Sequence, residues 1–418
     1  MNIVLLTDTF FPNYRGGTEV YVLNLAKALL KHNASVSVVC FKGCDTEVIY
    51  VQEGIGVFQL PQNDLDFNAL SSFISRNKID VIHIHSFNGR LSTDFLRKIF
   101  SLNIEVFFTP HLVNNFCING GTLLRNNSDK CNGIVKVTKC QTCLFSNYKH
   151  LPSIYRLYSF HLIIQLLNRT GIFKEKIPQS FLEVQDILKR IEYLKQDRVN
   201  IIALSEWYKD ILVSNGLKNV NYVPQAVDET FIKSTTLSEG NLGFNWLYVG
   251  RLSPEKGVKE LIDAFNKRTN KDEHLWLVTF LGHNLSSYEN EVISLIKENE
   301  RISIFKNLSS NEVAEIISKC ACVILPSKVT EMAPLVLREA NALGKPVLTS
   351  TFIRENIEAK KLGITFTYDI KDDLCHKLET IKLRIQDGFF NEITATNYLT
   401  YREVAELHLK YYRHAIEK

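Results

Sequence analysis

The sequence has no long hydrophobic run. Across 418 residues, no stretch reaches the roughly 18 to 20 consecutive apolar residues that a membrane-spanning helix requires. A short apolar run, residues 2–6, follows Met1 directly, without the charged segment that opens a signal peptide. These two absences argue against an integral membrane protein and against secretion, so we expect a cytoplasmic location.

The chain also has little net charge, and it contains no tandem repeat or low-complexity tract. Lys and Arg number 49 against 45 Asp and Glu, a balance of +4. With no recognised fold or groove-reading helix for nucleic acid, this small excess argues against a nucleic-acid partner. Its length predicts two domains, and 45% apolar residues are ample for two buried cores.

One segment departs from the even charge balance. Residues 129–176 carry eight Lys and Arg against two acids, with six aromatic residues interleaved. Such a patch could meet an anionic lipid-linked sugar or the inner leaflet of a membrane. An apolar run within it, residues 154–167, is too short to span a bilayer and is also consistent with a core helix. Peripheral contact with the inner membrane face is therefore one expectation beside a purely cytoplasmic location.

Predicted strands alternate with predicted helices, which is typical of parallel sheets in an α/β fold. We predict a first domain at 1–224, a second at 229–394 and a terminal helical segment at 395–418, with the linker at residues 224–228. The predicted strands lie at 2–6, 35–41, 80–85, 105–109, 200–204 and 221–223, and then near Phe244, Leu275, Ile302, Val323 and Val347.

The most informative segment is SKVTEMAPLVLREANALGKPVLT, residues 327–349. A buried strand precedes a polar loop that carries Glu331, and Pro334 opens a helix that ends at Gly344. Glu339 lies on the second turn of that helix, and free amide groups near the loop would face the same crevice. In open α/β sheets, the carboxyl ends of the strands are where nucleotides bind. Two glutamates alone would more often be solvated surface charges.

This segment resembles the signature of the group 1 (family 4) glycosyltransferases. Their pattern is a Glu, seven residues, a second Glu, then Ala and a Gly-x-Pro-Val strand entry. The family often has Gly-Phe-Gly after the first Glu, and this chain departs from that pattern with Met332, Ala333 and Pro334. The matching residues are Glu331, Glu339, Ala340, Gly344, Pro346 and Val347.

A second segment, YVGRLSPEKG at 248–257, matches the same family. Arg251 and Lys256 sit there at a strand-to-helix crossover, and two fixed cations suit a diphosphate leaving group. The alternative is a pair of ordinary loop charges. The resemblance implies that both cations grip the donor pyrophosphate, that Glu339 holds the ribose hydroxyls, and that Glu331 contacts the transferred sugar. It also places Met332, Ala333, Pro334 and Leu335 in the donor-binding loop.

Two small residues follow the first strand, where the family has a glycine loop. Gly16 and Gly17 permit close backbone approach, and Thr18 is predicted to cap the helix that follows. A role beside the phosphates or the acceptor competes with that of a simple turn. Ser205, at the end of another strand, has a weaker claim near the donor, and its alternative role is the N-cap of the next helix.

Several histidines lie at predicted strand ends. His111 follows the strand at 105–109, and enzymes of the resembled family often place a histidine there beside the transferred sugar. A satisfied structural histidine is the alternative. His83 and His85 alternate along VIHIHS and so share one face of a strand, where packing is the simpler interpretation.

Four of the nine cysteines cluster within 27 residues, and the last two form Cys-Gln-Thr-Cys. In a reducing cytosol such a cluster favours a structural zinc site, although unligated buried thiols and disulfides stay open because the spacing is irregular for a zinc ribbon. A subset of the resembled family carries a similar arrangement in this region, which we take as an insert at about 111–176. The four residues are Cys117, Cys131, Cys140 and Cys143.

The resemblance covers nearly the whole chain and implies a GT-B fold, in which two Rossmann-like domains face each other across a cleft. It implies transfer of a sugar from a nucleoside-diphosphate donor to a glycan or lipid-linked acceptor, with retention at the anomeric carbon and no cofactor required for catalysis. The final helix would pack back on the first domain. The rival interpretations are a nucleotide-sugar isomerase or epimerase on the same fold, and a non-catalytic glycan-binding partner.

Overall fold

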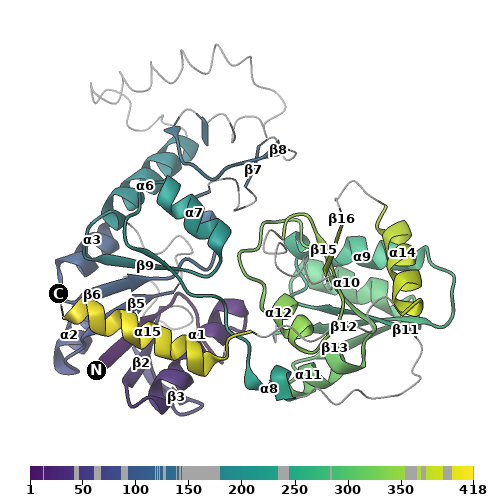
Figure 1. The fold of residues 1–418 in the computed structure, drawn as a ribbon, viewed down its shortest axis with the longest axis horizontal. Helices are drawn as coiled ribbons and strands as arrows, with labels where there is room; N and C mark the ends of the chain where they lie inside the picture. Colours follow the sequence, from purple (N-terminus) through teal and green to yellow (C-terminus); the bar gives the residue numbers. More distant parts are fainter. Residues whose placement is uncertain are drawn as a thin grey trace.

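The computed structural model contains two Rossmann-like domains, each built on a parallel sheet (Figure 1), which confirms the predicted α/β architecture. It describes residues 1–12, 14–41, 47–60, 67–85, 93–117, 179–233, 244–282, 285–353, 365–368, 373–388 and 398–417, together with scattered positions between 119 and 143. Among the helices of these residues, none is both long and apolar enough to cross a bilayer.

The first sheet has eight strands in the order β10-β9-β6-β5-β1-β2-β4-β3. All neighbours are parallel except β3, which pairs antiparallel with β4 at one edge. The hairpin between these two strands turns at Glu53 and Gly54, both with positive φ. The strands are β1 (Asn2–Leu6), β2 (Ser35–Cys40), β3 (Val48–Gln52), β4 (Ile55–Gln59), β5 (Val81–Ile84), β6 (Glu105–Phe108), β9 (Val199–Ala203) and β10 (Val220–Tyr222).

The second sheet has six strands, all parallel, in the order β13-β12-β11-β14-β15-β16. The chain order reverses between β11 and β14. The loops after these two neighbouring strands therefore begin side by side at the carboxyl ends of the strands, where ligands bind in such sheets. The strands are β11 (Phe244–Val249), β12 (Glu273–Thr279), β13 (Ile302–Lys306), β14 (Cys322–Leu325), β15 (Val347–Ser350) and β16 (Thr365–Tyr368).

Amphipathic helices flank the two sheets and bury their apolar faces in separate cores. A small two-stranded ribbon, β7 (Leu124–Arg125) with β8 (Asp129–Lys130), lies in the cysteine region. The helices are α1 (Gly17–Lys31), α2 (Phe67–Arg76), α3 (Thr93–Ser101), η1 (Val113–Asn115), α6 (Gln179–Leu194), α7 (Glu206–Ser214), α8 (Glu229–Lys233), η3 (Pro254–Lys256), α9 (Val258–Asn266), α10 (Ser287–Lys297), α11 (Ser310–Lys319), α12 (Leu335–Ala342), α14 (Leu374–Gln386) and α15 (Tyr401–Ile416).

The final helix, α15, packs against α1 and belongs to the core of the first domain (Figure 1). It opens with a capping box in which Thr400 and Glu403 satisfy each other's backbone amides. Just before it, the returning chain runs beside the outgoing linker, because the amide of Val227 donates to the carbonyl of Leu399 at 2.9 Å. The chain therefore crosses between the domains twice at one place.

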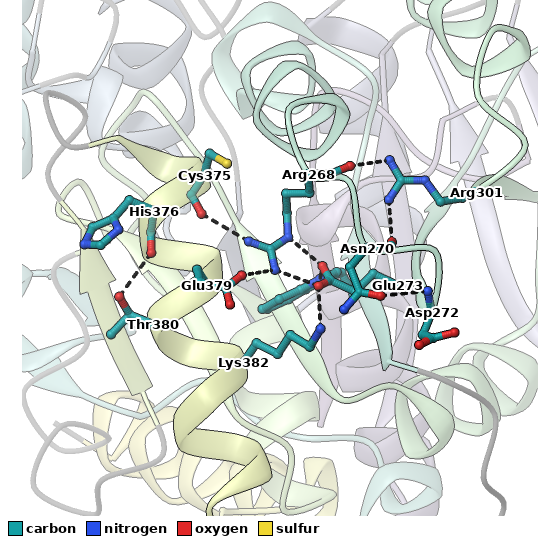
Figure 2. Close-up of polar contacts among 11 residues, drawn as sticks. Arg268, Asn270, Asp272, Glu273, Arg301, Cys375, His376, Glu379, Thr380 and Lys382 are labelled. Carbon is teal, nitrogen blue, oxygen red and sulfur yellow. Dashed lines mark hydrogen bonds and ion pairs between the residues drawn. The ribbon is translucent and has the colours of Figure 1, made fainter.

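A buried ion network joins the loop between α9 and β12, the start of β12, and α14 in the second domain (Figure 2). Glu273, fully buried, accepts from Arg268 at 2.5 and 2.7 Å and from Lys382 at 2.7 Å. The indole of Trp246 donates to the same carboxylate at 3.0 Å, while Arg268 also reaches the half-exposed Glu379. Glu273 begins β12, so this network lies at the amino-terminal ends of the strands. The loops that follow β11 and β14 lie at the other end, where the strands finish.

Candidate functional site

Two helix amino termini meet between the domains. A methyl group added at Gly17, the first residue of α1, would lie 3.8 Å from Cδ1 of Leu335, the first residue of α12. The first amides of a helix have no partner within the helix, and the helix dipole makes that end attractive to anions. The two domains thus direct unsatisfied amides towards a common region.

The prediction that Thr18 caps α1 is wrong. The helix begins one residue earlier, with Gly16 as its N-cap in an extended conformation and without any side-chain cap. A side chain at Gly16 would crowd the carboxylate of Glu19, because an added Cβ would lie 2.8 Å from its Oε2. Two glycines in succession therefore leave this helix end open.

Lys256 and Glu331 form an ion pair, with Nζ 3.0 Å from Oε2. Lys256 ends the loop after β11, and Glu331 lies in the loop after β14, where the hydroxyl of Ser327 also donates to its carboxylate. The two loops touch at Gly257, whose φ is +71° and where a Cβ would lie 2.0 Å from the carbonyl oxygen of Pro326. Only glycine allows this approach, which brings the cation and the carboxylate together.

Arg251, the second predicted cation, is less constrained than Lys256. Its side chain is 62% exposed and lies 3.5 Å from Glu255. An exposed pair of this kind holds a side chain weakly. The backbone of Arg251 is fixed instead, because its carbonyl accepts from the hydroxyl of the buried Tyr248 at 2.6 Å. The guanidinium is therefore available to a ligand, while its attachment point is held.

Glu339 lies on α12 beside the linker between the domains. Burial, together with the negative charge of Asp228, raises the pKa of Glu339 to about 8. Its carboxyl group is therefore mostly protonated at pH 7. Asp228, whose Oδ1 accepts from the amide of Thr230, was not among the predicted site residues. Its place at the end of the PQAVD linker motif is the signal that could have identified it.

The predicted donor-binding loop, residues 331–335, contacts the first domain as well as the second. Met332 is buried and belongs to the apolar core of the first domain, with Ala333 packed against it. Arg338, also buried, donates to the carbonyl of Gln225 in the linker at 3.0 Å. The unusual Met332 and Ala333 thus form an apolar contact between the two halves of the molecule.

Ser205 is buried at the carboxyl end of β9. It occupies the N-cap position of α7, but its side chain makes no capping hydrogen bond. Within the described residues its hydroxyl has no hydrogen-bond partner. The predicted N-cap position of Ser205 is therefore confirmed, although its side chain makes no capping bond, and its place near a donor stays a prediction.

His111 follows β6 and is bound to a second histidine. Its Nε2 lies 3.1 Å from Nδ1 of His85, and the ring of Tyr21 packs edge-on at a centroid distance of 4.9 Å. Burial, with a smaller contribution from His408, lowers the pKa of His111 to about 3. The imidazole is therefore neutral at pH 7. His83 and His85 do share one face of the sheet, with centroids 4.0 Å apart.

The four clustered cysteines line one small cavity beside Phe116 and Leu123, with a volume of about 30 Å³. Burial raises the pKa of the Cys117 and Cys140 thiols. Within the described part of the chain, no three His, Cys, Asp or Glu side chains are arranged to hold a metal ion. Four thiols at one cavity nevertheless have the ligand chemistry of a structural zinc site, so that site stays a prediction.

Metal analysis tests the zinc prediction. Protein prepared without added zinc should contain about one zinc per chain, because four thiolates bind zinc tightly enough to retain it. Replacing Cys140 by Ser should lower the bound zinc and the melting temperature, whereas the matched change Cys375→Ser, in the second domain, should leave the zinc content unchanged. Metal-free native protein would contradict the prediction.

The basic and aromatic segment at 129–176 extends largely outside the described residues, which in this region end at Cys143. The predicted contact with a membrane or with a lipid-linked sugar therefore stays a prediction.

Comparison with known proteins identifies both halves of the chain. Residues 243–380 match the family described as "Glycosyl transferases group 1", and residues 15–128 match "Glycosyltransferase Family 4". The uncharacterized glycosyltransferase MJ1178 of Methanocaldococcus jannaschii is 31% identical over 165 residues, which cover 38% of this chain and 42% of that protein. An uncharacterized 42.6 kDa protein in the cps region of Klebsiella pneumoniae is 22% identical over 99% of this chain and 100% of its own length.

Solved structures share the arrangement of both domains. Sucrose-phosphate synthase from Thermosynechococcus elongatus superimposes with a TM-score of 0.65 and 14% identity, covering 99% of this chain and 98% of its own. Anabaena HepE in complex with UDP and glucose does so with a TM-score of 0.62 and 14% identity, covering 98% of each chain. The chain therefore carries a family 4 glycosyltransferase domain and a group 1 glycosyltransferase domain, and it is a transferase with the GT-B fold.

Proposed function

We propose that this enzyme transfers a sugar from a nucleoside-diphosphate sugar to a glycan or lipid-linked saccharide, with retention of anomeric configuration, in cell-surface polysaccharide synthesis. The pairing of Lys256 with Glu331, beside two open helix termini, carries the proposal. The complex of HepE with UDP and glucose supports a nucleotide-sugar donor. The relative in a cps region supports the polysaccharide context.

The proposed chemistry needs a site that stabilises a departing diphosphate. Glu331 pairs with Lys256 in the structure. When donor binds, the diphosphate would pair with Lys256 instead, and Glu331 would accept from hydroxyls of the sugar. Arg251 and the amides of α12 would add further donors, so that cations and dipoles meet the charge that develops on the leaving oxygen. The bond from the anomeric carbon to the phosphate oxygen breaks, the acceptor oxygen bonds to that carbon, and its proton passes to the leaving phosphate.

Glu339 is proposed to bind the ribose hydroxyls, and its raised pKa makes that binding depend on pH. Ribose hydroxyls donate to a carboxylate, so binding would release the proton that Glu339 carries below about pH 8. The affinity for UDP should therefore rise roughly tenfold from pH 7 to pH 9, where the diphosphate is already ionised. Calorimetry in buffers of different ionisation enthalpy would measure both the affinity and the proton release.

The matched control is Glu339→Gln, which should bind UDP more weakly at pH 9 and show no such pH dependence. An affinity for UDP that is constant from pH 7 to pH 9 in the native protein would contradict the ribose role of Glu339.

The proposed function is tested by incubating the pure protein with a panel of labelled nucleotide sugars, with and without glycan or lipid-linked acceptors. Transfer, or slow donor hydrolysis, supports a transferase acting on that donor, and the NMR coupling of the new anomeric proton reports retention. Formation of an epimer without acceptor would favour an isomerase. No binding of any nucleotide would contradict the proposed donor and favour a glycan-binding role.

A further inference from the structure

Buried imidazole rings lie side by side in the first domain, between the end of β5 and α15. The ring of His83 lies 4.0 Å from that of His85 and 5.4 Å from that of His408 on α15. His83 uses both ring nitrogens, since Nδ1 pairs with the hydroxyl of Tyr412 at 2.5 Å and Nε2 with that of Thr109 at 2.7 Å. The hydrogen-bonding capacity of the His83 ring is therefore fully used within the domain, as expected of a packing residue.

His85 differs because it uses only one nitrogen. Its Nδ1 lies 3.1 Å from Nε2 of His111, while its own Nε2 is buried without a hydrogen-bond partner among the described residues. Burial lowers the pKa of His85 far below its ordinary value, and that of His111 to about 3. Both rings are therefore neutral at pH 7 and carry one proton each, so one ring donates and the other accepts.

The unpartnered Nε2 of His85 indicates which of the two histidines donates the hydrogen bond between them. If His111 donated, the proton of His85 would lie on its buried Nε2, as an N–H group without an acceptor. If His85 donates from Nδ1, the buried Nε2 keeps only a lone pair, and every ring N–H of His85 is used. Buried orphan N–H groups are the rarer case in proteins, so the second arrangement is favoured. His111 then carries its proton on Nδ1.

We propose that His85 is a positioning residue that sets the tautomer of His111, so that His111 offers its Nδ1–H as a hydrogen-bond donor to an oxygen of the transferred sugar. This inference rests on the proposed function. Tyr21, packed edge-on against His111, restrains the ring in the same orientation. A donor tautomer also prevents Nδ1 of His111 from acting as a general base, which agrees with the leaving phosphate taking the acceptor proton.

The tautomer can be measured without an assay of activity. In protein labelled with ¹⁵N-histidine, the nitrogen shifts distinguish a protonated ring nitrogen from a bare one, and loss of a signal in His111→Gln assigns that ring. We expect the proton of His111 on Nδ1. A proton on Nε2 of His111 would overturn the proposal.

A matched pair of variants tests the consequence for turnover. In His85→Asn the amide can still donate where Nδ1 lies, whereas in His85→Asp the carboxylate only accepts and draws the proton of His111 to Nε2. We expect the Asn variant to retain most of kcat and the Asp variant to lose roughly 100-fold or more, with the donor KM little changed. Melting curves and UDP binding establish that each variant is folded.

Equal losses of kcat in the two variants, or a reversed tautomer with normal kcat, would overturn the positioning role. The variant His111→Ala separates this result from the proposed function. If that variant turns over normally, His111 has no role beside the sugar, even where the tautomer is as expected.

Discussion

Replacing Lys256 by Ala should lower kcat roughly 10²- to 10³-fold while the protein stays folded. Removing one preorganised donor to a developing negative charge has an effect of this size, and here the donor is a full cation. The affinity for UDP should fall much less, because in the proposed site Arg251 and the helix amides would still contact the diphosphate. Steady-state kinetics with the best donor, together with calorimetry of UDP, would separate the two effects.

The next lysine along the chain supplies the control. Lys259 lies on α9 and pairs with Glu291, away from Glu331, so Lys259→Ala should leave kcat and the donor KM unchanged. The variant Lys256→Met, which keeps most of the aliphatic stem, distinguishes loss of charge from loss of packing. Turnover within a few-fold of the native rate in both Lys256 variants would show that this residue does not stabilise the leaving group.

Replacing Glu273 by Gln should lower the free energy of unfolding of the second domain by about 3–5 kcal/mol. The change leaves Arg268 and Lys382 as two buried cations without their shared carboxylate, and breaking a buried pair from one side typically costs this much. Denaturant unfolding followed by tryptophan fluorescence would measure it, since Trp246 belongs to the network.

The same substitution at Glu379 is the matched control. Glu379 also pairs with Arg268, but its side chain is 51% exposed, so Glu379→Gln should cost less than about 1 kcal/mol. Equal losses for the two variants would show that burial does not decide the strength of this network.

Acid should remove the stabilisation that Glu273 gives to the folded second domain. Burial alone would raise the pKa of Glu273, but hydrogen bonds from Arg268, Lys382 and Trp246 outweigh it and lower the pKa to about 2, from an ordinary value of 4.5. A lowered pKa in the folded state means that the stabilisation is complete above about pH 4.5 and disappears as the pH falls towards 2. The variant Glu273→Gln should lack this part of the acid sensitivity, whereas the native protein should show it.

Much of the fold could be predicted from the sequence because most strands are buried on both faces. Residues 322–325 are continuously apolar and residues 244–249 are interrupted only by Asn245, and strands were predicted at both places. The β3–β4 hairpin was missed because β3 is an edge strand whose Ile49 and Val51 are exposed. The Glu53–Gly54 pair, where both residues adopt positive φ, was the available signal.

The candidate site was predictable only as separate pieces. Local motifs indicated Lys256 and Glu331 individually, but their ion pair depends on β11 and β14 being neighbours in the sheet. The contact between His85 and His111 likewise depends on the pairing of β5 with β6. Glu273 belongs to no motif, and a single charged residue at the start of a strand does not reveal that Arg268 of the preceding loop and Lys382 of the distant α14 will pair with it.

The double crossing between the domains affects synthesis of the protein. The core of the first domain includes Tyr401, Leu409 and Tyr412 of α15, which the ribosome makes only after the second domain. At roughly 5–20 residues per second, the first sheet waits on the order of 10–35 s, while the whole second domain is made, before its final helix arrives. During that interval the apolar surface that α15 will cover is exposed, so we expect the nascent first domain to bind chaperones until α15 has been made.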